Sequence, residues 1–237
     1  MRKISKDVAQ HMEKLSNEDG VISALAIDQR GSLKNMLAQA ANKPADETTI
    51  VDFKEAVSSE LTPYASAILT DPEYGLPATK VRDKNCGLLL SYEKTGYDTT
   101  EPGRMCDLIP DQSALRIKKD GADAVKFLLY YDPDESDEIN DKKKAFVERV
   151  GAETKANNLA FFLELLTYDG KMDSVKSEEY AKVKPNKVLR TMKEFSKSQY
   201  DVTVLKVEMP FNIEFVEGHN GGNNMVYTER EAKELLK

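Results

Sequence analysis

The sequence has few of the residues that bind metals or form structural disulfides. Its two histidines, His11 and His219, are too few for a zinc site built on two or three imidazole ligands. Its two cysteines, Cys86 and Cys106, form neither a disulfide framework nor a C-x-x-C metal motif. We therefore expect a protein that uses no metal and no other cofactor, and the cysteine content favours a reducing, cytoplasmic location.

Long apolar segments and an excess of positive charge are absent too. No apolar run approaches the roughly 18 residues that a membrane-spanning helix needs, and the first residues, M-R-K-I-S-K-D, lack the apolar core of a signal peptide. Basic residues number 34 against 41 acidic ones, which gives a formal charge of -7. This balance argues against nucleic acid and anionic membranes as partners, although helix N-termini and local basic residues can still bind a phosphorylated ligand.

Two common catalytic or cofactor-binding motifs are missing. There is no G-x-G-x-x-G after the first predicted strand, and no other glycine-rich phosphate loop, which disfavours an open doubly wound sheet that binds a dinucleotide. There is also no G-x-S-x-G elbow, and neither histidine has an evident catalytic partner, which disfavours nucleophilic serine or cysteine catalysis.

Three strand-like runs each carry an ionisable residue in an apolar context. They are residues 123–130 with Lys126, residues 160–166 with Glu164, and residues 202–210 with Lys206. The last run is rich in β-branched residues, so we expect a strand that is buried on both faces. A single such charge is often satisfied by a salt bridge without any catalytic role, but three together favour a functional site.

The order of the predicted elements indicates the fold. Lys126, Glu164 and Lys206 follow one another at intervals of roughly 40 residues, and each interval holds one strand and one helix. Such alternation predicts right-handed βαβ units and a parallel sheet in an α/β architecture, the TIM (β/α)8 barrel, with catalytic residues at the carboxyl ends of the strands. The strands are predicted over residues 21–27, 65–70, 87–90, 123–130, 160–166 and 202–210.

Only six of the eight strand-helix units of a barrel are found. We expect a single barrel domain over residues 1–237 that ends before strands seven and eight. The predicted helices cover residues 5–16, 47–61, 111–119, 136–157, 178–196 and 228–237, with another beginning near Leu33. The segment D-P-E-Y-G-L-P after the second strand is predicted to be a loop, because its proline and glycine residues favour turns.

Two lysines and a carboxylate in an apolar pocket suit Schiff-base chemistry. Burial and a neighbouring cation both lower the pKa of an amine, so Lys126 could activate Lys206 as a nucleophile toward a ketone. Glu164 is then suited to transfer protons. Asp28 follows the first strand and could orient a substrate hydroxyl, while an Asp at this position could equally cap the turn or pair with Arg30.

Several long segments resemble the tagatose-bisphosphate aldolases of Gram-positive cocci. They are A-L-A-I-D-Q-R-G at 24–31, L-T-D-P-E-Y-G-L-P-A-T-K at 69–80, Y-E-K-T-G-Y-D at 92–98, G-A-D-A-V-K-F-L-L-Y-Y at 121–131, E-Y-A-K-V-K-P at 179–185 and V-L-K-V-E at 204–208. The resemblance implies a class I aldolase on a (β/α)8 barrel. The resemblance further implies that Lys206 forms the Schiff base, that Glu164 is the acid/base, and that Lys126 and Asp28 are also catalytic. It implies substrate contacts by Asp28, Gln29 and Lys126.

The same resemblance implies a carbon–carbon lyase of the lactose and tagatose 6-phosphate pathway. Its reaction would be the reversible cleavage of tagatose 1,6-bisphosphate to dihydroxyacetone phosphate and glyceraldehyde 3-phosphate. Phosphorylated ketohexoses and triose phosphates are then the expected partners, and a homo-oligomer is a further expectation. The family's phosphate site is expected beyond Lys237. The alternative is a non-catalytic sugar-phosphate-binding protein on a degenerate or truncated barrel, a reading that the missing strands leave open.

Overall fold

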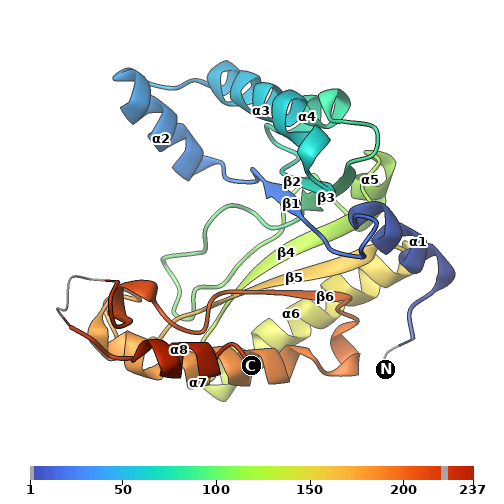
Figure 1. Cartoon of the computed structure of the whole chain (residues 1–237). Helices are drawn as coiled ribbons and strands as arrows, with labels where there is room; N and C mark the ends of the chain where they lie inside the picture. Colours follow the sequence, from blue (N-terminus) through green and yellow to red (C-terminus); the bar gives the residue numbers. More distant parts are fainter. Residues whose placement is uncertain (1–2, 220–223) are drawn as a thin grey trace. The chain divides into compact units, whose positions relative to one another are not determined.

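The computed structural model describes residues 3–219 and 224–237 as an alternation of strands and helices (Figure 1). The strands are β1 (Ala24–Ala26), β2 (Ala67–Thr70), β3 (Gly87–Ser91), β4 (Ala124–Tyr131), β5 (Ala160–Thr167) and β6 (Val204–Val207). The helices are α1 (Lys6–Leu15), α2 (Gly31–Ala41), α3 (Glu47–Leu61), α4 (Leu76–Val81), α5 (Ala114–Lys119), α6 (Asp137–Ala156), α7 (Glu178–Phe195) and α8 (Glu229–Glu234). Short 3-10 turns cover Thr62–Tyr64, Ser198–Tyr200 and Ile213–Phe215.

The strands follow their order in the chain. The sheet runs β1-β2-β3-β4-β5-β6, and the pairings of β1 with β2, β2 with β3 and β3 with β4 are parallel. A doubly wound sheet would reverse its order at a switch point, whereas here each strand takes its place beside the preceding one, as in a (β/α) barrel. Within the described residues, the predicted α/β class and the six strands are confirmed.

Apolar runs explain which strands are buried. Every residue of β2 and β3 is buried, and in β4 and β5 only alternate residues toward the carboxyl end are half-exposed. The prediction that β6 is buried on both faces is wrong, because its residues are half-buried or exposed. The strand order explains the difference: β6 is the outermost strand of the sheet on its side, so it packs beside only one other strand.

Local sequence signals set the helix ends. Ser5, Asp46, Ser177 and Thr228 each accept a backbone N–H bond in the first turn of α1, α3, α7 and α8. The loop predicted over residues 71–77 is wrong at its end, because α4 begins at Leu76 with a proline in its first turn, where the missing N–H costs nothing. No helix among the described residues is long and apolar enough to cross a membrane.

The chain divides into two compact units. The first contains residues 1–97, 107–127 and 150–162, and the second contains residues 98–106, 128–149 and 163–237. The division falls inside β4, after Phe127, and inside β5, after Phe162, so each of these strands contributes residues to both units.

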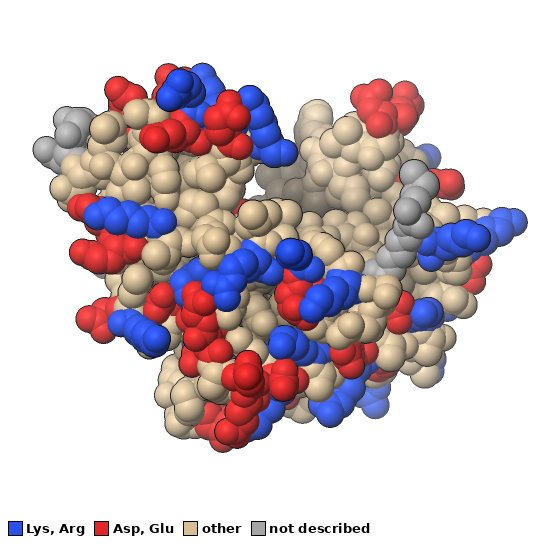
Figure 2. All heavy atoms as spheres, turned by 90° about the horizontal axis from the view of Figure 1, so that it is seen from below, with Lys and Arg blue, Asp and Glu red and all other residues tan. Residues whose placement is uncertain are grey.

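Acidic and basic side chains are interspersed on the face shown in Figure 2. Exposed ion pairs one helical turn apart also occur on the helices, such as Lys142 with Glu138 on α6 and Lys182 with Glu178 on α7. Pairs of this kind contribute only a few tenths of a kcal/mol each, about 0.3–0.5, so they serve solubility more than stability.

Candidate functional site

The first unit holds a buried cluster of three charges: Asp28, Glu93 and Lys126. The Lys126 ammonium lies 2.8 Å from Asp28 Oδ2 and 2.5 Å from Glu93 Oε1. Only 2% of the Lys126 side chain and 7% of the Glu93 side chain are exposed. Burial raises the pKa of Glu93, and the adjacent Lys126 ammonium offsets part of that rise. The predicted neighbours Asp28 and Lys126 are therefore brought together, and Glu93 joins them.

Main-chain hydrogen bonds hold this cluster in place. Lys126 pairs with Ser91 in the register of β3 and β4, and its carbonyl accepts the N–H of Tyr92 at 2.8 Å. The carbonyl of Glu93 accepts a hydrogen bond from the Arg30 guanidinium at 2.8 Å. A second Arg30 nitrogen donates to Glu73 at 2.8 Å, and Asp28 accepts a hydrogen bond from Lys126.

A second buried ion pair supports the strand end that carries Asp28. Lys54 of α3 donates to the carbonyl of Ile27 at 2.8 Å and pairs with Asp71, which follows β2. Burial lowers the pKa of Lys54, and Asp71 opposes the shift. Because the Ile27 carbonyl is held, the residue after it is directed toward Lys126.

Glu93 was missed by sequence reasoning, although one signal could have found it. It lies two residues beyond the end of β3, as Asp28 lies two residues beyond the end of β1, and residues that follow parallel strands meet at one edge of the sheet. Because the segment from Ser91 to Gly103 is polar and rich in turn residues, Glu93 resembles an ordinary surface residue in the sequence. Gln29, which was expected to contact substrate, is exposed.

The second unit brings together the other two predicted catalytic residues. Glu164 Oε1 of β5 lies 2.8 Å from Lys206 Nζ of β6, close enough for direct proton transfer. The Glu164 side chain is 16% exposed and the Lys206 side chain 41%, so the expected deep burial of this lysine is wrong. The predicted activation of Lys206 by Lys126 stays a prediction.

Polar contacts fasten the ends of β5 and β6 to each other. Glu208 accepts the N–H of Thr167 at 2.7 Å and its hydroxyl at 2.5 Å. Lys184 of α7 lies 2.9 Å from the other Glu208 oxygen. Glu208 lies two residues after Lys206, and Thr167 lies three residues after Glu164. Their contact therefore helps to hold β5 and β6 in the register that places Glu164 beside Lys206.

A cavity of about 720 Å³ opens beside these contacts in the second unit. Its lining includes Leu166, Glu208, Lys184 and Arg104. Leu166 lies two residues after Glu164 in β5 and therefore on the same face of that strand. Glu164 thus lies on the face of β5 that borders a cavity with both acidic and basic groups.

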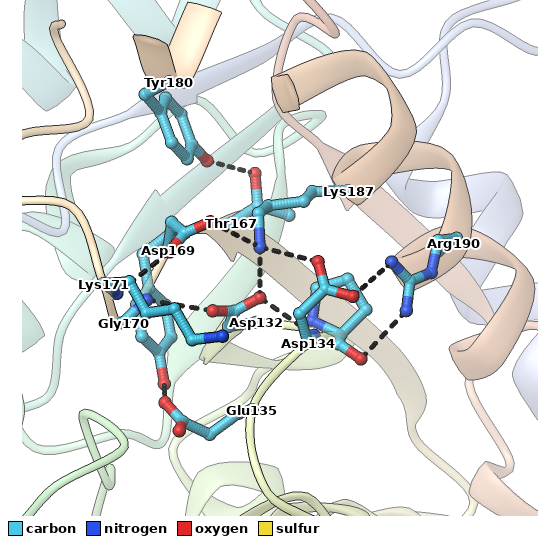
Figure 3. Close-up of polar contacts among 12 residues, drawn as sticks. Asp132, Asp134, Glu135, Thr167, Asp169, Gly170, Lys171, Tyr180, Lys187 and Arg190 are labelled. Atoms are coloured by element: carbon cyan, nitrogen blue, oxygen red, sulfur yellow. Dashed lines mark hydrogen bonds and ion pairs between the residues drawn. The ribbon is translucent and has the colours of Figure 1, made fainter. Parts of the chain in front are cut away.

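A separate charged cluster, also in the second unit, surrounds the buried ammonium of Lys187 (Figure 3). This group lies 2.5 Å from Asp132, 2.9 Å from Asp134 and 3.0 Å from Asp169. Asp132 follows β4 and Asp169 follows β5, while Lys187 comes from α7. Burial lowers the pKa of Lys187, but the three aspartates outweigh it and the net shift is upward. The cluster ties two loops to a helix and needs no substrate to explain it.

Comparison with known proteins places the chain in one family. The DeoC/LacD family of aldolases matches residues 22–236. A tagatose 1,6-diphosphate aldolase 2 of Enterococcus faecalis is 59% identical over 93% of this chain and 66% of its own length. The corresponding figures are 53%, 99% and 72% for a protein of that name from Streptococcus agalactiae, and 57%, 98% and 68% for the tagatose 1,6-diphosphate aldolase of Listeria monocytogenes.

The chain spans about two thirds of the length of these curated relatives. Among solved structures, a fructose-bisphosphate aldolase from Plasmodium falciparum superimposes with a TM-score of 0.57 at 17% identity, over 95% of this chain and 68% of that one. This similarity concerns the fold alone. The family match over nearly the whole chain and the identities above 50% show that the chain belongs to the DeoC/LacD family of aldolases.

Proposed function

We propose that the protein is a class I, Schiff-base aldolase that reversibly cleaves tagatose 1,6-bisphosphate to dihydroxyacetone phosphate and glyceraldehyde 3-phosphate. The observation that carries the proposal is the 2.8 Å contact between Glu164 and Lys206, an amine beside a proton acceptor in a chain of the aldolase family. The names of the relatives supply the substrate, since three of them are called tagatose 1,6-diphosphate aldolases.

Lys206 would form the covalent bond. Its ammonium first gives a proton to Glu164, and the free amine then attacks the C2 carbonyl of the ketose to form a carbinolamine. Glu164 returns the proton to the C2 hydroxyl, which leaves as water, and an iminium remains. The iminium is the electron sink that the next step requires.

Cleavage follows from that sink. The C4 hydroxyl loses its proton, the C3–C4 bond breaks, and its electron pair moves into the iminium to give an enamine with release of glyceraldehyde 3-phosphate. Protonation of the enamine at C3 and hydrolysis of the resulting iminium release dihydroxyacetone phosphate and regenerate Lys206. The aldol direction reverses each step.

Asp28 and Lys126 would act on the substrate's hydroxyl and phosphate oxygens. Asp28 supplies an acceptor for a hydroxyl proton, and Lys126 supplies a fixed positive charge. Gln29, which is exposed and adjacent to Asp28, is proposed as a further substrate contact. We further infer that the protein acts in the cytoplasm on phosphorylated ketohexoses and triose phosphates.

Reductive trapping tests this function. Borohydride added with dihydroxyacetone phosphate should reduce the iminium and leave a stable adduct, which peptide mass mapping places on Lys206. Lys206→Met should abolish the adduct, whereas Lys182→Met, a change of an exposed lysine on α7, should leave it intact. Binding of the triose phosphate without any adduct would indicate a binding protein rather than an enzyme, and an adduct on another lysine would overturn the assignment of Lys206.

A further inference from the structure

The Glu93 carboxylate in the first unit contacts Lys126, a residue of the proposed catalytic set. It lies 2.5 Å from Lys126, and its own side chain is 7% exposed. A carboxylate withdrawn from water to this extent is destabilising unless a cation or hydrogen bonds compensate. The cost of burying Glu93 is therefore met in part by its contact with Lys126.

The chain around Glu93 is built to keep that carboxylate in position. Glu93 forms an antiparallel bridge with Leu108, and the next residue, Lys94, donates its N–H to Asp107 at 2.8 Å. The Arg30 guanidinium is aimed at the Glu93 carbonyl, 2.8 Å away. The backbone is thus held on both sides, and the side chain meets an ammonium that is itself only 2% exposed.

Lys126 is consequently flanked by two carboxylates of different surroundings. Asp28 is 12% exposed, a little more open than Glu93. A substrate hydroxyl that approaches Asp28 competes for the contact between Asp28 and Lys126, whereas the contact with Glu93 lies deeper and can persist. Glu93 can therefore keep the ammonium charged and aimed while Asp28 exchanges partners.

We propose that Glu93 is a positioning residue for the aldol reaction, which acts through Lys126 and holds its ammonium where the substrate's oxygen atoms develop charge. This inference rests on the proposed aldolase function. In this proposal, Glu93 acts in the step that breaks or forms the carbon–carbon bond. Formation of the Schiff base depends on Glu164 and Lys206 in the second unit.

Two assays on the full chain separate these steps. Glu93→Gln keeps the shape and a hydrogen-bonding group but removes the charge. We expect the rate of ketose bisphosphate cleavage, kcat, to fall by about tenfold to 100-fold with a smaller change in KM. Trapping of dihydroxyacetone phosphate on Lys206 by borohydride should stay within about twofold of the unaltered protein, because the Glu164–Lys206 pair is intact.

A matched control removes an equivalent charge elsewhere. Glu194 lies 2.5 Å from Lys197, accepts the Tyr200 hydroxyl at 2.5 Å and is 18% exposed on its side chain. Glu194→Gln therefore breaks a Glu–Lys contact of the same length that does not involve Lys126, and Gln can still accept the Tyr200 hydroxyl. Cleavage by this variant should stay within about twofold of the unaltered protein. Glu93→Asp, which keeps the charge on a shorter side chain, should recover part of the rate that Glu93→Gln loses.

The outcomes distinguish this inference from the proposed function. If the unaltered chain neither cleaves nor forms the adduct, the proposed function fails and Glu93 loses its role with it. If the unaltered chain does both and Glu93→Gln cleaves at the same rate, only the role of Glu93 is overturned. A parallel loss of cleavage, trapping and thermal stability in both Glu93 variants would also overturn it, because that pattern indicates a structural role.

Discussion

At the scale of single residues, the chemistry depends on where protons can move. Glu164 and Lys206 are 2.8 Å apart, so a proton can pass between them without an intervening water. Replacing Glu164 by Gln preserves the size of the side chain but removes the proton acceptor. We expect kcat to fall by about 100-fold to 10,000-fold, with a much smaller effect on substrate binding, in a coupled assay that detects the triose phosphates. An equal loss in binding and turnover would contradict this role.

The buried charges of the first unit make a prediction about pH. Burial raises the folded-state pKa of Glu93 above 4.5, and Lys126 offsets only part of the shift. A raised carboxyl pKa contributes stability below the unfolded-state value, and this contribution is lost as the pH rises through the folded-state value. In urea unfolding between pH 4 and 8, Glu93→Gln should therefore flatten the decline on the alkaline side. An unchanged pH profile would contradict it.

Removing the cation should be more damaging than removing Glu93. Lys126→Met leaves the carboxylates of Asp28 and Glu93 without their shared ammonium, which should reduce the free energy of unfolding by about 3–5 kcal/mol at neutral pH. Adding Glu93→Gln to that variant removes one of the two negative charges and should recover part of the loss. Urea denaturation of the single and double variants measures the coupling. Additive losses would show that the two residues do not interact in the fold.

At the scale of elements, glycine determines how closely one element can approach another. A Cβ on Gly87 of β3 would lie 2.6 Å from the carbonyl oxygen of Lys14 in α1, which is a backbone atom and cannot turn aside. Gly87→Ala should therefore push α1 away from β3 and cost about 1–3 kcal/mol of stability. A Cβ on Gly31, at the start of α2, meets no atom within 4 Å, so Gly31→Ala should be neutral or slightly stabilising. Thermal denaturation of both variants checks the contrast, and equal effects would contradict it.

At the scale of the whole molecule, the two compact units share the backbone of β4 and β5. A strand that is ordered in one unit constrains the next residues in the other, so we expect a single cooperative unfolding transition. Far-UV circular dichroism and tyrosine fluorescence should report the same midpoint. Gly87→Ala in the first unit and Lys187→Met in the second should each shift both signals together. Two separated transitions would show that the units unfold independently.

Sequence reasoning identified most of the fold because its signals are local. Helix α3 has the predicted bounds, Glu47–Leu61, since Asp46 caps one end and Pro63 limits the other. Strand ends and short elements are predicted less accurately: β1 is only three residues long, and the predicted loop over residues 71–77 overlaps the first two residues of α4. Their limits depend on which neighbouring strand or helix supplies hydrogen bonds and covers apolar surface, and a local pattern does not contain that information.

The candidate site divides in the same way. The residue types that aldol chemistry requires, and their positions within or just after strands, follow from the sequence, because an ionisable residue in an apolar run is visible in the sequence alone. The partners do not follow from it. Only the tertiary structure pairs Lys126 with Glu93 and leaves Lys206 partly exposed beside Glu164. Periodicity specifies the strand and face of a side chain, whereas distance and burial depend on how separate segments of the chain pack together.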